Sequence, residues 1–104
     1  MKMNATNKTD LLSKEFKVAC AIFSFNRKDE KIWYMKLCDS LEKDGIAKST
    51  VLNALKTLFD YGIVKAEYGE TEKGRPGRLL FVAGESTQTI GKIWEEYWQP
   101  THPV

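Results

Sequence analysis

Residues 46–64 read Ile46-Ala-Lys-Ser-Thr-Val-Leu-Asn-Ala-Leu-Lys-Thr-Leu-Phe-Asp-Tyr-Gly-Ile-Val64 and combine a helical pattern with a strand pattern. Gly62 is predicted to end the helix in the left-handed conformation that glycine adopts without strain. The β-branched residues after it predict a strand. We therefore predict a helix over 48–61 that leads directly into a strand. Its buried face has the spacing i, i+4, i+7 and i+8 and consists of Val51, Leu55, Leu58 and Phe59.

The bulk composition is that of one small globular domain. The chain has 104 residues, of which 42% are hydrophobic and 29% are charged, and a formal net charge of +2. This length supports one modest core, and the net charge alone is too small to argue for a nucleic-acid partner. No apolar run approaches the ~18–20 residues that span a bilayer, and the N-terminus lacks a secretory signal. We expect a cytoplasmic protein, in which Cys20 and Cys38 are buried free thiols.

Two helical patterns precede residue 46. A polar lead-in, residues 1–9, is predicted to be disordered. Asp10 or Thr9 is expected to cap the first helix, which runs to about Asn26. The apolar face of this helix is broad, so we expect it to lie at the centre and to be contacted on more than one side.

The second helical pattern follows a charged connection. Residues 27–31 alternate in charge and are expected to be solvated. Residues 32–34 are β-prone and are expected to pair briefly with a sheet. An apolar repeat from Tyr34 then predicts a helix that ends near residue 45. Its exposed side is acidic, so we do not expect it to bind phosphate; the carboxylates are Asp39, Glu42 and Asp44.

Two strand patterns enclose a basic loop. Residues 63–68 and 79–83 are predicted strands, and residues 69–78 between them contain three glycines and one proline. A loop of this length is not a tight turn. We therefore expect it to project from the hairpin.

A last helix is predicted over 86–98, with Pro100 preventing its continuation. Residues 99–104 are predicted to form a disordered tail. The apolar face of this helix would form a large patch if it were exposed. It packs either on the first helix of the same chain or on a second copy, and we favour a homodimer through the first and last helices. The predicted dimerisation residues are Ile90, Ile93, Trp94, Tyr97 and Trp98.

Two adjacent helices, a hairpin and a basic loop, in this order, resemble the winged helix-turn-helix family, in particular the small MarR- and PadR-type transcriptional regulators. The resemblance covers about residues 32–83. It implies an α+β winged helix over residues 10–98, with a three-helix core, a two- or three-stranded antiparallel wing and an added C-terminal amphipathic helix. The residues that carry it are Ile46, Ser49, Thr50, Val51, Leu55, Leu58, Gly62, Ile63, Val64 and the segment Lys73-Gly74-Arg75-Pro76-Gly77-Arg78.

The resemblance implies that double-stranded DNA is the partner. The helix over 48–61 would enter the major groove, and the loop over 69–78 would lie on the minor groove or the backbone. Asn53 suits adenine, and Lys56 suits guanine or a phosphate. Pro76-Gly77 would hold the two neighbouring arginines apart on a stiff tip. The predicted DNA contacts are Lys48, Ser49, Thr50, Asn53, Lys56, Lys73, Arg75 and Arg78.

Three positions in or directly before the helix over 48–61 leave alternatives open. Ala47 stands where the family usually has Ser or Thr, so the helix cap is weak or displaced to Ser49. Thr50 either contacts DNA or belongs to the packed face. Leu52 is apolar on the presumed DNA face, where it meets a thymine methyl group or another protein.

The sequence favours a DNA-binding transcriptional regulator that is not an enzyme and uses no metal or cofactor. The one histidine, His102, lies in the predicted tail, and the motifs of nucleophilic, metal or phosphate-loop chemistry are absent. One alternative is a winged helix that binds proteins and not DNA, which the small net charge and Leu52 favour. Another is the DNA-binding part of a plasmid or viral replication protein. The sequence does not specify a small-molecule effector.

Overall fold

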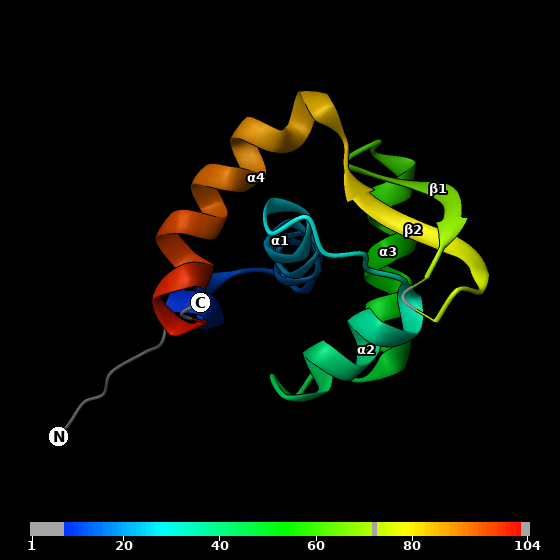
Figure 1. The fold of residues 1–104 in the computed structure, drawn as a ribbon. Coiled ribbons are helices and arrows are strands. Elements are labelled where there is room, and N and C mark those ends of the chain that lie inside the picture. The colour runs from blue at the N-terminus through cyan, green and yellow to red at the C-terminus, as the bar shows by residue number, and fades with distance from the viewer. Residues whose placement is uncertain (1–7, 72, 103–104) are drawn as a thin grey trace, which may run out of the picture.

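The computed structural model describes residues 8–71 and 73–102 of the chain (Figure 1). Three helices come first, a two-stranded hairpin follows, and a fourth helix ends the chain. The main elements are α1 (Lys14–Arg27), α2 (Tyr34–Glu42), α3 (Lys48–Asp60), β1 (Val64–Glu70), β2 (Pro76–Val82) and α4 (Thr87–Ile93). Single turns of 3-10 helix lie at Lys8–Leu11, Gly84–Ser86 and Gln99–Thr101, and a π-helical turn over Trp94–Trp98 continues α4 directly.

α1 is the central element, with α4 on one side and α3 and the hairpin on the other (Figure 1). Five consecutive residues, from Val18 to Ile22, are buried. Because successive helix residues are about 100° apart, five in a row cover the whole circumference. The prediction of a helix contacted on more than one side is confirmed.

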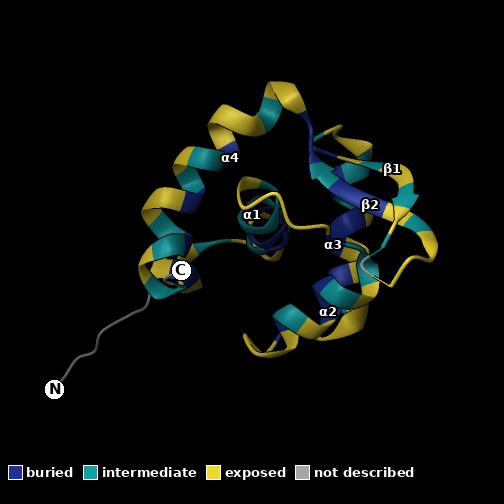
Figure 2. Cartoon of the chain, in the orientation of Figure 1, coloured by how far each residue is buried: buried dark blue, intermediate teal, exposed yellow. Residues whose placement is uncertain are grey.

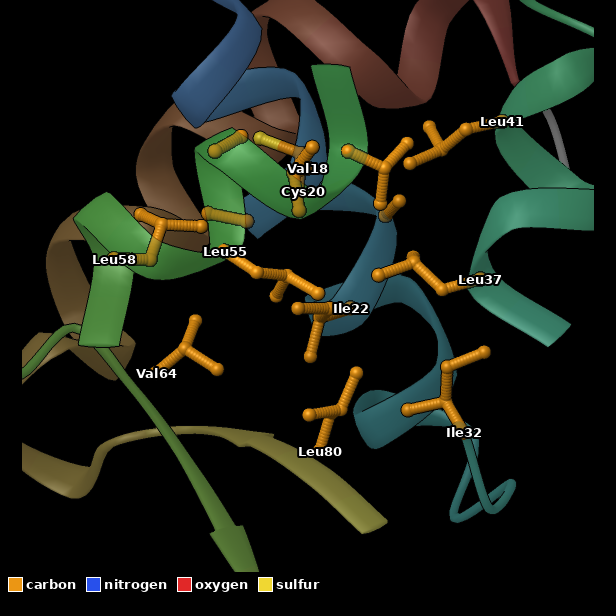
Figure 3. Close-up of a cluster of buried hydrophobic side chains, with 14 of the residues drawn as sticks. Val18, Cys20, Ile22, Ile32, Leu37, Leu41, Leu55, Leu58, Val64 and Leu80 are labelled. Atoms are coloured by element: carbon orange, nitrogen blue, oxygen red, sulfur yellow. The ribbon is translucent and has the colours of Figure 1, made fainter. Parts of the chain in front are cut away.

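One cluster of buried side chains joins all of these elements. In Figure 3, side chains of α1 face those of α2, α3 and the hairpin across a common centre. Burial is concentrated where the elements meet, and the outer faces of α2, α3 and α4 are exposed (Figure 2). The labelled members are Val18, Cys20, Ile22, Ile32, Leu37, Leu41, Leu55, Leu58, Val64 and Leu80.

The start of α1 differs from the prediction. Ser13 caps the helix, since it is extended and its hydroxyl oxygen accepts a hydrogen bond of 3.2 Å from the Phe16 N–H. Thr9 is buried and donates to the Tyr97 carbonyl oxygen at 2.7 Å. The predicted cap at Thr9 or Asp10 is wrong. Residues 8 and 9, which were predicted to belong to a disordered lead-in, are part of a 3-10 turn. Residues 1–7 lie outside the described part of the chain.

The end of α3 is formed as the sequence predicts. Gly62 has φ of +72°, in the left-handed region. The Ile63 N–H donates to the Leu58 carbonyl at 2.9 Å, and the Gly62 N–H donates to the Phe59 carbonyl at 3.0 Å. This is the Schellman pattern, which satisfies carbonyls at the helix end. It turns the chain directly into β1.

The hairpin loop is much shorter than predicted. The antiparallel register runs from Val64 opposite Val82 to Glu70 opposite Pro76, so both strands extend into the segment expected to be loop. The Thr71 N–H then donates to the Arg75 carbonyl at 2.8 Å. Gly69 belongs to the ladder, where it lies opposite Gly77. A Cβ on Gly69 would come within 2.8 Å of the Leu79 side chain. This glycine serves close packing, whereas the sequence pattern suggested a turn.

The edge of β2 that does not pair with β1 forms hydrogen bonds with the Asn26 side chain and the Ile32 carbonyl. The Leu80 N–H donates to the Ile32 carbonyl at 2.8 Å, which confirms the brief pairing expected near residues 32–34. Asn26, at the end of α1, donates from Nδ2 to the Leu80 carbonyl at 3.2 Å, and its Oδ1 accepts from the Val82 N–H at 2.9 Å. The Asn26 amide thus takes the place of a third strand. It holds the hairpin against the helical core.

The last helix packs on α1 of its own chain. Ile90, Trp94 and Trp98 are buried, and the Trp94 ring lies 5.6 Å from the Phe23 ring between centroids. A Cβ on Gly91 would stand 3.2 Å from the Phe23 ring, so this glycine permits the close approach. These three side chains form core in a single copy, so they are not available as the predicted dimer interface. The other two predicted dimerisation residues, Ile93 and Tyr97, are partly exposed.

The described end of the chain contacts the turn between α2 and α3. The His102 ring stacks on the Trp98 ring with centroids 3.8 Å apart, and His102 Nε2 lies 2.7 Å from Asp44 Oδ1. Through these contacts His102, in the segment predicted to be a disordered tail, reaches the body of the fold. Residues 103–104 lie outside the described part.

Candidate nucleic-acid interface

The outward face of α3 is polar except at one position. The exposed residues on this face are Lys48, Ser49, Leu52, Asn53 and Lys56. Thr50 is half-buried, which favours a packed position for it.

The N-terminal end of α3 has no side-chain cap. Ala47 is the N-cap residue and makes no such bond, and Ser49 lies inside the helix. The first backbone N–H groups of α3 therefore keep their capacity to bind an anion. The weak cap expected from Ala47 is confirmed.

The turn of the wing and its strand β2 carry three exposed cations, Lys73, Arg75 and Arg78. Arg78 lies within β2 opposite Tyr68, and its guanidinium carbon is 5.8 Å from the Phe59 ring centroid of α3. The prediction that Pro76-Gly77 would separate the two arginines on a loop tip is wrong, because both residues belong to β2. Arg75 is at the turn, whereas Arg78 is beside α3.

Two adjoining hollows connect the helix cations with the wing cations. One, of about 170 Å³, lies between α3 and β2 and is lined by Tyr34, Leu52, Leu55, Lys56, Phe59, Arg78 and Leu80. The other, of about 390 Å³, lies between the start of α2 and the wing and is lined by Trp33, Tyr34, Met35, Thr71, Lys73, Arg75, Pro76, Gly77 and Arg78. Because Tyr34 and Arg78 line both, the start of α2, α3 and the wing share one surface. We call it the wing–α3 surface.

The cations of the wing–α3 surface have no ion-pair partner within the described residues. Lys65 on β1 forms an ion pair of 3.0 Å with Glu67, and Asp44 is engaged by His102. Over residues 8–71 and 73–102, no ion-pair partner is found for Lys48, Lys56, Lys73, Arg75 or Arg78. Among these residues, two separate elements therefore bring positive charge to the wing–α3 surface without a carboxylate to balance it.

Tyr34 is a member of this surface that the sequence analysis did not single out. Its hydroxyl lies 3.5 Å from the Lys48 carbonyl oxygen, at the limit of a hydrogen bond, and so touches the start of α3. A hydrogen bond with Cys38, with a contribution from desolvation, raises the pKa of its phenol. Tyr68, which lies opposite Arg78 in the hairpin, is 87% exposed on β1.

Cys20 and Cys38 are free and buried, as predicted. Burial raises the pKa of the Cys20 thiol to about 12, so it stays protonated at neutral pH and is a poor nucleophile. Over the described ranges, no group of three or more His, Cys, Asp or Glu residues is placed to hold a metal ion. Over the same ranges, no helix has the length and apolar character needed to cross a membrane.

Comparisons with known proteins identify the fold. No protein-family model and no curated protein sequence matches this chain. The crystal structure of the circadian clock associated protein Pex from Anabaena matches with a TM-score of 0.65 at 17% identity, over 88% of this chain and 82% of that one. Pex from Synechococcus sp. matches with a TM-score of 0.56 at 24% identity, over 83% and 82%.

The fold is a winged helix. It is α+β, with α1 to α3 as the helical core, β1 and β2 as the wing and α4 as the C-terminal addition. At these identities the likeness concerns the fold and does not assign a ligand or a subfamily.

Proposed function

We propose that this protein is a DNA-binding transcriptional regulator of the kind that its resemblance to MarR- and PadR-type proteins implies. In this proposal α3 enters the major groove, and the wing lies on the neighbouring minor groove or backbone. The observation that carries the proposal is the wing–α3 surface, on which cations from α3 and from the wing lie on one side of the molecule with no ion-pair partner among the described residues. The proposed role is not enzymatic and requires no cofactor, and the proposed location is the cytoplasm.

The dimensions of α3 suit a major groove. Its 13 residues span about 20 Å at 1.5 Å per residue, and a major groove about 12 Å wide admits one helix. Lys48 and Ser49 stand at its uncapped start, where backbone N–H groups add to phosphate binding. Asn53 and Lys56 are exposed one and two turns further along. These two are the proposed base contacts of α3.

The wing supplies sequence-independent attraction in this proposal. Arg75 and Arg78 present guanidinium groups, which pair with phosphates and enter narrow minor grooves. Lys73 adds a third positive charge near the turn. Such contacts release counterions from DNA, so binding should weaken steeply as salt rises.

A homodimer remains part of the proposal, with a revised interface. A two-fold dimer would place two copies of α3 on successive half-sites. Since α1 already covers the aromatic face of α4, a second copy would contact the outer surface that α4 leaves, including Ile93 and Tyr97.

A protein-binding role is the second candidate, because Leu52 and Met35 are 42% and 49% exposed on the wing–α3 surface. A titration of the protein with random-sequence duplex DNA separates the two. Fluorescence anisotropy at ~50 mM and ~200 mM salt should show binding that weakens strongly between the two conditions. Undetectable binding at the lower salt would contradict the DNA proposal and favour the protein-binding role.

A further inference from the structure

We propose that Leu52 reads thymine: its side chain and the hollow beside it receive the C5-methyl group of one thymine in the major groove. This inference rests on the proposed function and assigns a specificity-determining contact within it.

Leu52 stands in the middle of the exposed face of α3. It is one turn after Lys48 and one turn before Lys56, and 42% of its surface is exposed. Any duplex that meets both lysines therefore also meets this leucine. A leucine here gives no hydrogen bond to a base edge or a phosphate, so its contribution to binding must be apolar contact.

The hollow next to Leu52 is suited to an apolar group. It measures about 170 Å³, and four apolar side chains, which we call its floor, line it together with Tyr34, Lys56 and Arg78: Leu52, Leu55, Phe59 and Leu80. A bound water needs two to four polar partners, which these four side chains do not offer. A small apolar group that enters gains from the removal of its surface from water.

The rim of the hollow is positively charged, which determines how DNA would approach it. Lys56 and Arg78 stand on opposite elements, α3 and β2, and both line the hollow. Phosphates can pair with these cations at the rim, but a phosphate inside the hollow would lose its water without recovering hydrogen bonds. The floor is therefore left for a different part of the duplex.

Among the groups that base pairs present in the major groove, the C5-methyl of thymine is the apolar one. The other groups are hydrogen-bond donors or acceptors, which an apolar floor does not satisfy. The chemistry of the hollow and of Leu52 thus points to thymine. The lysines on either side supply affinity, and the leucine supplies discrimination.

The test uses deoxyuridine, which differs from thymidine by the absence of this methyl group. Duplexes are first selected from a random pool with the wild-type protein, and each thymine of the selected site is then replaced in turn. Burial of one methyl group predicts that binding falls about fourfold at one position of each half-site. In Leu52→Ala that position should become indifferent to the replacement, whereas Leu52→Met, which keeps an apolar side chain, should retain the discrimination.

Leu11→Ala is the matched control, because Leu11 is a leucine 67% exposed before α1, outside the wing–α3 surface. It should keep the wild-type response to deoxyuridine. An equal penalty in wild type and Leu52→Ala would overturn the assignment, and so would wild-type binding that is indifferent at every thymine. If the wild-type protein selects no duplex at all, the proposed function itself fails, and that result is distinct from both.

Discussion

The wing and the last helix are both rich in large side chains, which are exposed in the wing and buried in the helix. The wing extends its cations into solvent, with Lys73, Arg75 and Arg78 all exposed. α4 and the turn after it bury their apolar side chains, and Trp94 and Trp98 are only 5% and 4% exposed. From the sequence, both regions were expected to contact a partner molecule. In the structure the wing cations are exposed, whereas the apolar side chains of the helix pack on α1 of the same chain.

The difference follows from what each side chain requires. A buried tryptophan removes a large apolar area from water, and the face of α1 opposite α3 is available to accept it. A lysine or arginine loses its hydration on burial unless a carboxylate compensates. A charged protruding segment is therefore better evidence for an external partner than an apolar helix face. The following predictions test this contrast, and the largest expected effect comes first.

Trp94→Ala should destabilise the protein by about 3–5 kcal/mol, because it leaves a cavity between α4 and α1. It also removes the donor to Ser24 Oγ. Urea unfolding measures the loss. Glu95→Ala, an exposed change on the next residue, should stay within about 0.5 kcal/mol of wild type. A small loss in Trp94→Ala, together with dissociation of a dimer, would show that Trp94 serves an interface after all.

Asn26→Ala should cost about 2 kcal/mol, because the Leu80 carbonyl and the Val82 N–H lose their side-chain partner at the edge of β2. The loss should appear in equilibrium unfolding, and amide exchange at Val82 should accelerate. Asn53→Ala removes the same side chain from the exposed face of α3 and should leave stability nearly unchanged. Equal stability of the two variants would mean that Asn26 does not anchor the wing.

His102→Ala should have the smallest effect, a loss of about 1 kcal/mol, because one hydrogen bond to Asp44 and the stacking on Trp98 disappear. The melting temperature of the variant measures it. Asp39→Ala removes an exposed carboxylate from α2 and provides the comparison. A wild-type melting temperature in His102→Ala would indicate that these contacts do not stabilise the end of the chain.

The helices and the core could be predicted from sequence because their signals are local and periodic. The stripe from Val51 to Phe59 and the left-handed Gly62 define α3 without knowledge of the rest of the chain. The winged-helix arrangement followed from the order of such elements. The exposed polar face of α3 was predicted in the same way, since a buried stripe fixes the opposite face.

The parts that sequence reasoning missed depend on contacts between distant residues. Asn26 takes the place of a strand because the end of α1 passes the edge of β2. Its partner Leu80 is 54 residues later in the chain. Gly69 and Gly77 resemble turn residues, but they pair with each other in the ladder. His102 has a partner only because the chain end returns to Asp44. The partner of α4 was ambiguous because an apolar stripe does not say which surface covers it.

The salt dependence of duplex binding in an Arg75→Ala plus Arg78→Ala variant tests the central claim most directly. If both arginines neutralise phosphates, the slope of log K against log salt should become shallower by about 1.8. Folding stability should stay within about 1 kcal/mol of wild type, since both side chains are exposed. A control with Lys14→Ala and Lys92→Ala removes the same charge from α1 and α4 and should keep the wild-type slope. An unchanged slope in the arginine variant would contradict the assignment of the wing to DNA.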